Sequence, residues 1–289
     1  MPTTIAITGA EGELGSILRQ QLWERGYTIR AFSRTPKVAV AGSVATEADG
    51  RIGWCHECRV ADLSAADGSF SGQLAGCDAV IHLAALAKPW EPYKRIHANN
   101  MLVDQAVFEE AARSCCKRVV FASTNHVQHG KSMRSTPETL DSTRFGAHLG
   151  GAGQPLMKAS DEPDPDSFYA VSKLLGESLG RLYAREHGLE FVALRIGWIV
   201  KEANPLDSSW VGTDDNREYM RAMNLGHHDC QEIFGRALDV EIPGGFRLGK
   251  GSFGIAYAVS NNSRRVFDLS STEALLGYAP VEDVERFFQ

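Results

Sequence analysis

The chain has 289 residues, with 30 Lys and Arg against 36 Asp and Glu, and a formal net charge of −6 at pH 7. A hydrophobic content of 43% and a charged content of 23% are typical of a globular protein with a sizeable core. The acidic balance excludes the basic surface needed to bind nucleic acid or an anionic membrane. We therefore expect a small-molecule ligand, with neither nucleic acid nor membrane as a partner.

The first residues run into an apolar strand without a secretory signal pattern, and no stretch approaches ~20 consecutive apolar residues. We expect a cytoplasmic protein. The six cysteines are therefore interpreted as reduced or buried thiols rather than as a disulfide framework. Cys55 and Cys58 form a lone C-x-x-C, and 227–230 is a run of potential metal ligands. Because neither has a second pair at a zinc-site spacing, no metal is predicted.

An apolar run at 3–8 ends in glycine and is followed by apolar residues at helical spacing from Leu14 to Leu22. Strands alternating with helices predict parallel βαβ units and a Rossmann doubly wound sheet over residues 1–196. Further strands are expected at 28–32, 58–61, 79–83, 119–122 and 191–196.

Two regions break this alternation. Residues 130–166 are rich in Gly, Pro, Ser and Asp and are predicted to form a long surface loop, which in compact domains is often functional. Residues 197–289 are predicted to form a small C-terminal α/β substrate lobe, with discontinuous contributions from elsewhere. Within this lobe, helices are expected near 215–223 and 228–237, and a strand near 255–259.

Gly9, Gly12 and Gly15 stand between the first strand and the first helix. Glycines there allow a tight turn, close approach of a pyrophosphate to the backbone, and packing of helix on strand. The free N–H groups and the dipole of the helix N-terminus favour an anion. This placement in the first βα unit predicts a dinucleotide site.

The second strand ends in Ser33 and Arg34, where NAD-selective sites usually carry an acidic residue. An arginine can bind a 2′-phosphate with two hydrogen bonds, so NADP is preferred over NAD. Arg34 as a solvated loop charge remains the alternative. Asp62 follows the third strand, where it can accept from an adenine amino group or cap a helix at Ser64.

Tyr169 and Lys173 lie four residues apart at the start of an amphipathic helix, on one face and one turn from each other. A phenol with an ordinary pKa near 10 becomes a useful base when a nearby ammonium stabilises the phenolate. We expect Tyr169 to exchange the proton and Lys173 to tune it.

With these features the chain resembles the extended short-chain dehydrogenases/reductases, the NAD-dependent epimerase/dehydratase family. The motifs that carry the resemblance are 8–15, 62–63, 82–85, Asn100, 122–126, 169–173 and 195–197. The resemblance implies that Thr124 orients the reacting hydroxyl or carbonyl, with neighbouring Ser123 a less fitting candidate. It also implies that Asn100 supports a proton-relay water behind Lys173.

Together, the glycine turn and the resemblance give a set of expected cofactor-binding residues. They are Gly9, Glu11, Gly12, Glu13, Leu14, Gly15, Ser33, Arg34, Asp62, Leu63, Leu83, Ala84, Ala85, Lys173 and Ile196.

Within that family the chain is most similar to uronate dehydrogenases and related glucose-6-phosphate dehydrogenases, which oxidise the anomeric carbon of a sugar to a lactone. The similarity implies that Asn125 and His126 contact the substrate. Two departures predict a rebuilt substrate pocket: the long 130–166 loop, and Trp198 at a position where a small polar residue is expected.

Arg217 and Arg221 lie one turn apart on the helix expected near 215–223. An arginine there could bind a carboxylate or phosphate, and Arg221 is the preferred candidate. A solvated helix face is an equally good interpretation.

The sequence therefore predicts an NAD(P)-dependent oxidoreductase acting on a sugar-like alcohol or carbonyl. Two alternatives remain: a nucleotide-sugar epimerase or dehydratase, disfavoured by the short C-terminal segment, and a non-catalytic dinucleotide sensor, disfavoured because Tyr169 and Lys173 are both present. The resemblance further implies a homodimer packed through the segment 100–113 and the helix that carries Tyr169.

Overall fold

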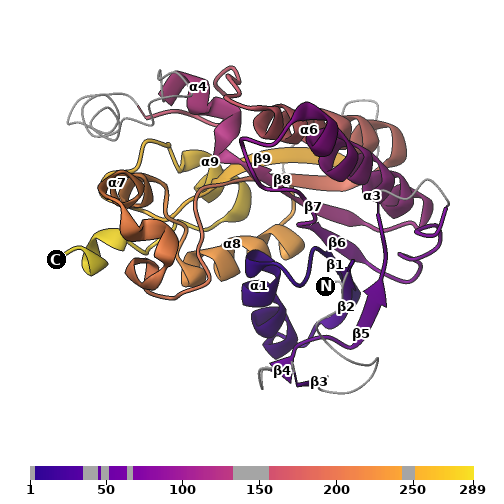
Figure 1. Cartoon of the computed structure of the whole chain (residues 1–289). Helices are drawn as coiled ribbons and strands as arrows, with labels where there is room; N and C mark the ends of the chain where they lie inside the picture. The colour runs from indigo at the N-terminus through magenta and orange to yellow at the C-terminus, as the bar shows by residue number, and fades with distance from the viewer. Residues whose placement is uncertain (1–3, 35–44, 47–51, 64–67, 133–155, 243–250) are drawn as a thin grey trace.

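The computed structural model describes residues 4–34, 45–46, 52–63, 68–132, 156–242 and 251–289 (Figure 1). Its centre is a seven-stranded sheet in the order β5-β2-β1-β6-β7-β8-β9. All neighbouring strands of this sheet are parallel. The strands are β1 (Thr4–Thr8), β2 (Thr28–Ser33), β5 (Glu57–Val60), β6 (Ala79–His82), β7 (Arg118–Thr124), β8 (Glu190–Ile196) and β9 (Ser252–Ala258).

The strand order reverses between β1 and β6, because β2 and β5 extend the sheet on one side and β6 to β9 on the other. Loops leave the carboxyl ends of β1 and β6 in opposite directions at such a point, which opens a crevice for a ligand. The predicted doubly wound Rossmann fold is confirmed.

The chain after residue 197 returns to this sheet. β9 pairs with β8 along its whole length, from Glu190 opposite Ser252 to Ile196 opposite Ala258. Residues 252–258 of the predicted C-terminal lobe therefore form the edge strand of the central sheet. The two later helices appear close to the expected ranges, as α7 (Asp214–Met223) and α8 (His227–Asp239).

Helices cover both faces of the sheet (Figure 1). α1 (Glu13–Glu24) and α8 lie on one face, and α3 (Leu102–Arg113) and α6 (Phe168–His187) on the other. Successive strand residues point to opposite faces, so Ile5 and Ile7 pack with α1 and α8, whereas Ala6 packs toward α3. Two apolar layers result, as a buried parallel sheet requires.

α6 approaches the sheet closely because it has glycines where it crosses two phenylalanines. A Cβ on Gly176 would lie 2.4 Å from Cζ of Phe121, and one on Gly180 would lie 2.2 Å from Cζ of Phe191. No real side chain fits at such distances, so any larger residue at either position would push α6 away. The glycines thereby fix the depth at which Tyr169 and Lys173 sit.

Short elements complete the described chain. They are β3 (Ala45–Thr46) and β4 (Ile52–Gly53), which pair antiparallel, α2 (Tyr93–Ile96), the π-helical turn η1 (His97–Met101), α4 (His129–Ser132), α9 (Ser270–Leu276) and the 3-10 turns η2 (Asn125–Gln128), η3 (Pro205–Asp207), η4 (Ser209–Gly212) and η5 (Val284–Phe287). Of the predicted 130–166 loop, residues 133–155 lie outside the described residues. No helix in the described part of the chain has the length and apolar character needed to cross a membrane.

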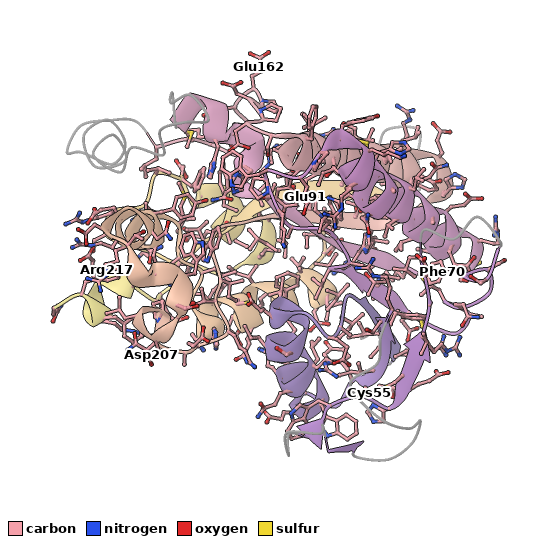
Figure 2. All side chains as sticks on the ribbon, viewed as in Figure 1. Cys55, Phe70, Glu91, Glu162, Asp207 and Arg217 are labelled. Carbon is pink, nitrogen blue, oxygen red and sulfur yellow. A yellow bond between two sulfur atoms is a disulfide. The ribbon has the colours of Figure 1, made fainter. Side chains whose placement is uncertain are left out.

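The interpretation of all six cysteines as reduced thiols is wrong for one pair. Cys55, labelled in Figure 2, lies just before β5 and forms a disulfide with Cys58 within that strand. The other four cysteines are free.

Candidate active site

Two adjoining cavities open at the carboxyl ends of β1 and β6. One, of about 380 Å³, reaches from the glycine turn to Tyr169, and the other, of about 270 Å³, extends under the ends of β2 and β5. They share Gly9, Gly12, Leu83 and Ala85, so together they form one elongated cleft. We call these two parts the catalytic half and the adenosine half.

The glycine turn lies between the two halves of the cleft. Gly9 has a φ of +68°, and a Cβ there would lie 2.8 Å from the backbone nitrogen of Ala84. A Cβ on Gly15 would lie 2.6 Å from the carbonyl oxygen of Ala10. Gly12 caps α1, and its own N–H donates to Gly9 at 3.0 Å. The turn is therefore built for close backbone approach, and the first free N–H groups of α1 face the cleft as an anion site requires.

All the residues expected at the cofactor line one half of the cleft or the other. The adenosine half is lined by Glu11, Ser33, Arg34, Asp62, Leu63 and Ala84, and the catalytic half by Glu13, Leu14, Gly15, Lys173 and Ile196, with the shared residues Gly9, Gly12, Leu83 and Ala85 between them.

Arg34 lies at the outer end of the adenosine half. Its Nη1 donates to Oδ1 of Asn99 at 3.1 Å, and Asn99 and Asp62 line the same half of the cleft. The guanidinium is exposed, so a phosphate could reach it. The alternative role for Asp62, capping a helix at Ser64, lies outside the described residues, because 64–67 are among those not described.

Tyr169 and Thr124 meet in the catalytic half. Ser167 caps α6 by accepting from the N–H of Ala170 at 3.2 Å, which places Tyr169 in the first turn. Thr124 ends β7, and its hydroxyl forms a hydrogen bond with that of Tyr169. Burial raises the pKa of Tyr169 to about 12, although the bond with Thr124 lowers it. Without a further positive charge, Tyr169 stays protonated at neutral pH.

Lys173 supplies that charge, one turn further along α6. It is 1% exposed, and its Nζ has no hydrogen-bond partner among the described residues. Burial lowers its pKa, although the negative charge of Asp104 raises it. A buried ammonium without a partner is costly. Its position at the cleft fits a ribose hydroxyl pair of a dinucleotide, as does the glycine cradle.

Asn100 does not line the cleft but is buried behind it, on η1. Its Oδ1 accepts from the N–H of Leu86 at 2.7 Å, and its Nδ2 donates to Oγ of Ser172 at 3.0 Å. Ser172 in turn donates to the carbonyl oxygen of Tyr169 at 2.7 Å. Asn100 therefore connects the loop after β6 to the first turn of α6.

Asn125 and His126 follow Thr124 and line the catalytic half. Nδ1 of His126 lies 2.8 Å from Oδ2 of Asp166, and Nδ1 of buried His129 lies 3.3 Å from the same oxygen. Burial alone would raise the pKa of Asp166, but hydrogen bonds from the two histidines hold it below its usual range. Asp166 thus fixes the ring of His126 at the cleft wall.

The side chains of His126, His129 and Asp166 also form the one group of three candidate metal ligands found in the described part of the chain, with their ligand atoms within 4.8 Å of one another. The run at 227–230 has a different role. It begins α8, where Asp229 accepts from the Tyr278 hydroxyl and from the N–H groups of Val281 and Glu282.

Trp198 lines the catalytic half together with Tyr169. Its ring stacks on Trp210 at 3.8 Å between centroids and meets the edge of Tyr219 at 5.5 Å. Asn125 donates to the Tyr219 hydroxyl at 3.4 Å, which ties the aromatic wall to β7. The indole is therefore a rigid apolar surface, wide enough for one face of a small ring.

Arg221 does not reach the cleft. Its Nε and Nη2 donate to the two carboxylate oxygens of Glu285 at 2.8 and 2.7 Å, and its Nη1 donates to Glu218 at 2.8 Å. Two carboxylates therefore occupy the donors that the predicted substrate anion would need. Arg217 is exposed, and its Nε donates to the carbonyl oxygen of Val211.

Sequence reasoning missed several parts of the site. Asp166, His129 and Trp210 were not identified, since each acts through a neighbour that is distant in the sequence. Asp104 was missed too, although a carboxylate one turn after Asn100 is visible in the sequence.

A model of the NAD dependent epimerase/dehydratase family matches residues 5–200 of the chain. The chain is 31% identical to an L-arabinose 1-dehydrogenase (NAD(P)(+)) of Haloferax volcanii, over 96% of this chain and 95% of that one. It is 27% identical to an NAD-dependent glucose-6-phosphate dehydrogenase of the same organism, over 99% of this chain and 96% of that one.

Among solved structures, the fold is similar to a uronate dehydrogenase from Agrobacterium tumefaciens. The TM-score is 0.71 and the identity 24%, covering 99% of this chain and 87% of that one. The expectation of a dehydrogenase is confirmed by curated relatives that carry this activity in their names. With a matched family model and a relative above 30% identity, the chain belongs to the NAD-dependent epimerase/dehydratase family, the extended short-chain dehydrogenases/reductases.

Proposed function

We propose that the protein is a sugar dehydrogenase that oxidises a ring hydroxyl with NAD(P) through Tyr169, Lys173 and Thr124, with Asn100 behind them. The observation that carries this proposal is the convergence of three features in one cleft: the glycine turn, the Tyr169–Thr124 hydrogen bond and the unpartnered Nζ of Lys173. NAD(P), when bound, supplies the hydride acceptor.

Three side chains have separate roles in the proposed reaction. Thr124 would donate a hydrogen bond to the reacting oxygen of the sugar, and the phenolate of Tyr169 would take the hydroxyl proton as the C=O bond forms, with bound NAD(P) as the acceptor of the hydride from the C–H bond. The ammonium of Lys173 would hold the ribose of that cofactor and stabilise the phenolate. Asn125 and the Asp166-anchored ring of His126 hold the other hydroxyls, while Trp198 packs on one sugar face.

The proposed substrate is an aldose, a uronate or a sugar phosphate. Support comes from the relatives, which are named for arabinose, glucose 6-phosphate and uronate. The experiment is to incubate the protein with NAD or NADP and a panel of these sugars while following formation of the reduced cofactor. Turnover that depends on both sugar and cofactor supports the proposal. No turnover with any sugar, with NAD co-purifying tightly, would favour an epimerase.

NADP is the proposed preferred cofactor. Arg34 lies at the adenosine half with its guanidinium exposed, and Ser33 beside it carries no charge to repel a 2′-phosphate. A forked guanidinium suits a phosphate group. Comparing kcat/KM for NADP and NAD with one sugar tests this preference.

A homodimer is proposed through α6 and its neighbours. Large apolar side chains there are exposed at helical spacing, with edge contact between Tyr93 and Phe168. The exposed apolar residues on α2, α3 and α6 are Tyr93, Leu102, Phe168, Val171, Leu175 and Leu182. Sedimentation analysis of the wild type and Leu175→Glu tests this, with a dimer expected only for the wild type. The enzyme is further proposed to act in the cytoplasm without a membrane or nucleic-acid partner.

A further inference from the structure

A chain of hydrogen bonds runs through the core from the cofactor turn to α3. The N–H of Ala84 donates to Oγ1 of Thr8 at 3.2 Å, that oxygen lies 2.6 Å from Nδ1 of His82, and Nε2 of His82 lies 3.0 Å from Oδ1 of Asp104. Thr8, His82 and Asp104 are wholly buried. Removing a carboxylate and an imidazole from water is costly, so this chain needs a compensating role.

The protons in this chain can be placed by elimination. A carboxylate only accepts, so Nε2 of His82 carries the proton that faces Asp104. Burial lowers the pKa of His82, although the hydrogen bond with Asp104 raises it, so the ring is neutral and its Nδ1 is bare. The Thr8 hydroxyl therefore donates to Nδ1 while it accepts from Ala84. His82 holds Asp104 in place without neutralising its charge.

The free side of Asp104 is turned toward α6. Its Oδ2 has no hydrogen-bond partner among the described residues, and a Cβ on Gly176 would lie 2.8 Å from it. Lys173 lies one turn earlier on the same helix, with its Nζ 4.6 Å from the centroid of the Phe121 ring. The same Cβ on Gly176 would lie 2.4 Å from Cζ of this ring, so the carboxylate of Asp104 and the ammonium of Lys173 both border Phe121.

The other charged side chains near Lys173 already have hydrogen-bond partners. Titratable groups on the elements packed around Lys173 include, within the described ranges, Tyr169 and Glu177 on α6, His82 on β6, Asp104 on α3, His126 on η2 and Arg195 on β8. Of these, Asp104 is the one whose charge acts on the pKa of Lys173. Arg195 donates to both oxygens of Glu177 at 2.9 and 2.8 Å, and His126 is held by Asp166. Asp104 is thus the negative charge available to Lys173.

We propose that Asp104, held by His82, is a positioning residue whose carboxylate keeps the buried Lys173 charged, so that the proton leaves Tyr169 and not the lysine. The inference rests on the proposed dehydrogenase function. Tyr169 and Lys173 share the loss of one proton, and which group loses it depends on the local charge. Loss from lysine leaves a neutral amine and an inactive phenol.

The first test is the pH profile of kcat in the holoenzyme. Removing a buried negative charge eases loss of a proton from the pair, so Asp104→Asn should lower the apparent pKa by about one unit. Because that proton now leaves Lys173, the plateau kcat should fall about tenfold. Asp104→Glu should restore both. Glu110→Gln, which removes another buried carboxylate from α3, should leave the profile unchanged.

The second test needs no turnover. In the cofactor-free protein a lysine with a lowered pKa binds fewer protons than in the unfolded chain, so stability rises with pH toward the ordinary lysine pKa. Asp104→Asn should steepen the rise in thermal unfolding midpoint between about pH 7 and pH 9.5 relative to the wild type. Asp104→Thr, neutral but still able to accept from His82, serves the same purpose if the asparagine variant does not fold.

An unchanged apparent pKa and an unchanged pH dependence of unfolding in both neutral variants would overturn the role of Asp104. That outcome is distinct from failure of the proposed function, in which the wild type itself would reduce no cofactor with any sugar.

Discussion

Arg221 and Glu285 form a bidentate ion pair, with Nε–Oε1 and Nη2–Oε2 distances of 2.8 and 2.7 Å. The pair joins α7 to the C-terminal turn η5, and the guanidinium also lies 5.0 Å from the ring of Phe288. This arrangement assigns Arg221 a structural role in place of an anion-binding one.

Arg221→Ala should therefore weaken folding and leave the KM for sugar nearly unchanged. The pair is part of a partly exposed network, so the expected loss is about 1 kcal/mol of unfolding free energy. Chemical denaturation and steady-state kinetics check the two quantities. Arg217→Ala, one turn away on α7, is the matched control and should change neither. A large rise in the KM for a uronate or sugar phosphate in Arg221→Ala would contradict this assignment.

Thr124→Ala should lower kcat by about 100-fold, because it removes a hydrogen-bond donor from the reacting oxygen. It also removes the hydrogen bond that lowers the pKa of Tyr169, so the rise of kcat should move to higher pH. The measurement is kcat against pH. Thr124→Ser should retain most activity, whereas near-wild-type kcat in Thr124→Ala would show that another group orients the substrate.

Arg34→Ala should raise the KM for NADP by about tenfold and leave the KM for NAD nearly unchanged, because the lost interaction reaches only a 2′-phosphate. Arg113→Ala, an exposed arginine on α3, is the control for loss of surface charge. Equal effects on both cofactors would contradict the proposed NADP preference.

Asp166→Asn should change the acid sensitivity of the protein. The pKa of Asp166 is held below its usual range, so its interactions stabilise the fold above the ordinary Asp pKa and are lost as the pH falls. The wild type should therefore lose more stability between about pH 5 and pH 3 than Asp166→Asn does. Thermal unfolding across this range measures the difference. The variant should also show a raised KM for sugar, since the ring of His126 loses its anchor.

The sequence alone predicted the sheet and most of the cleft, because both depend on local patterns. Apolar runs separated by amphipathic helices indicate parallel strands, and the glycine turn predicts a nucleotide site at the end of the first strand. Tyr169 and Thr124 belong to motifs on elements whose ends meet at one edge of the sheet, so their convergence followed from the topology.

Contacts that are distant in the sequence could not be predicted in the same way. Glu285 forms an ion pair with Arg221, which lies 64 residues away in the sequence. Only the packing of η5 on α7 reveals this pair. β9 joins the sheet although a polar segment separates it from β8. The disulfide between Cys55 and Cys58 was missed for another reason, since its spacing was visible but the expected compartment argued against it.

The most direct test of the whole account is the rate of cofactor reduction by wild type and Tyr169→Phe with the same sugar. We expect cofactor-dependent turnover by the wild type and a loss of about 1000-fold or more in kcat for Tyr169→Phe, because the base is gone. The dissociation constant for NADP should stay within a few-fold, since Lys173 and the glycine turn are intact. Wild-type kcat in Tyr169→Phe would contradict the assignment of Tyr169 as the base.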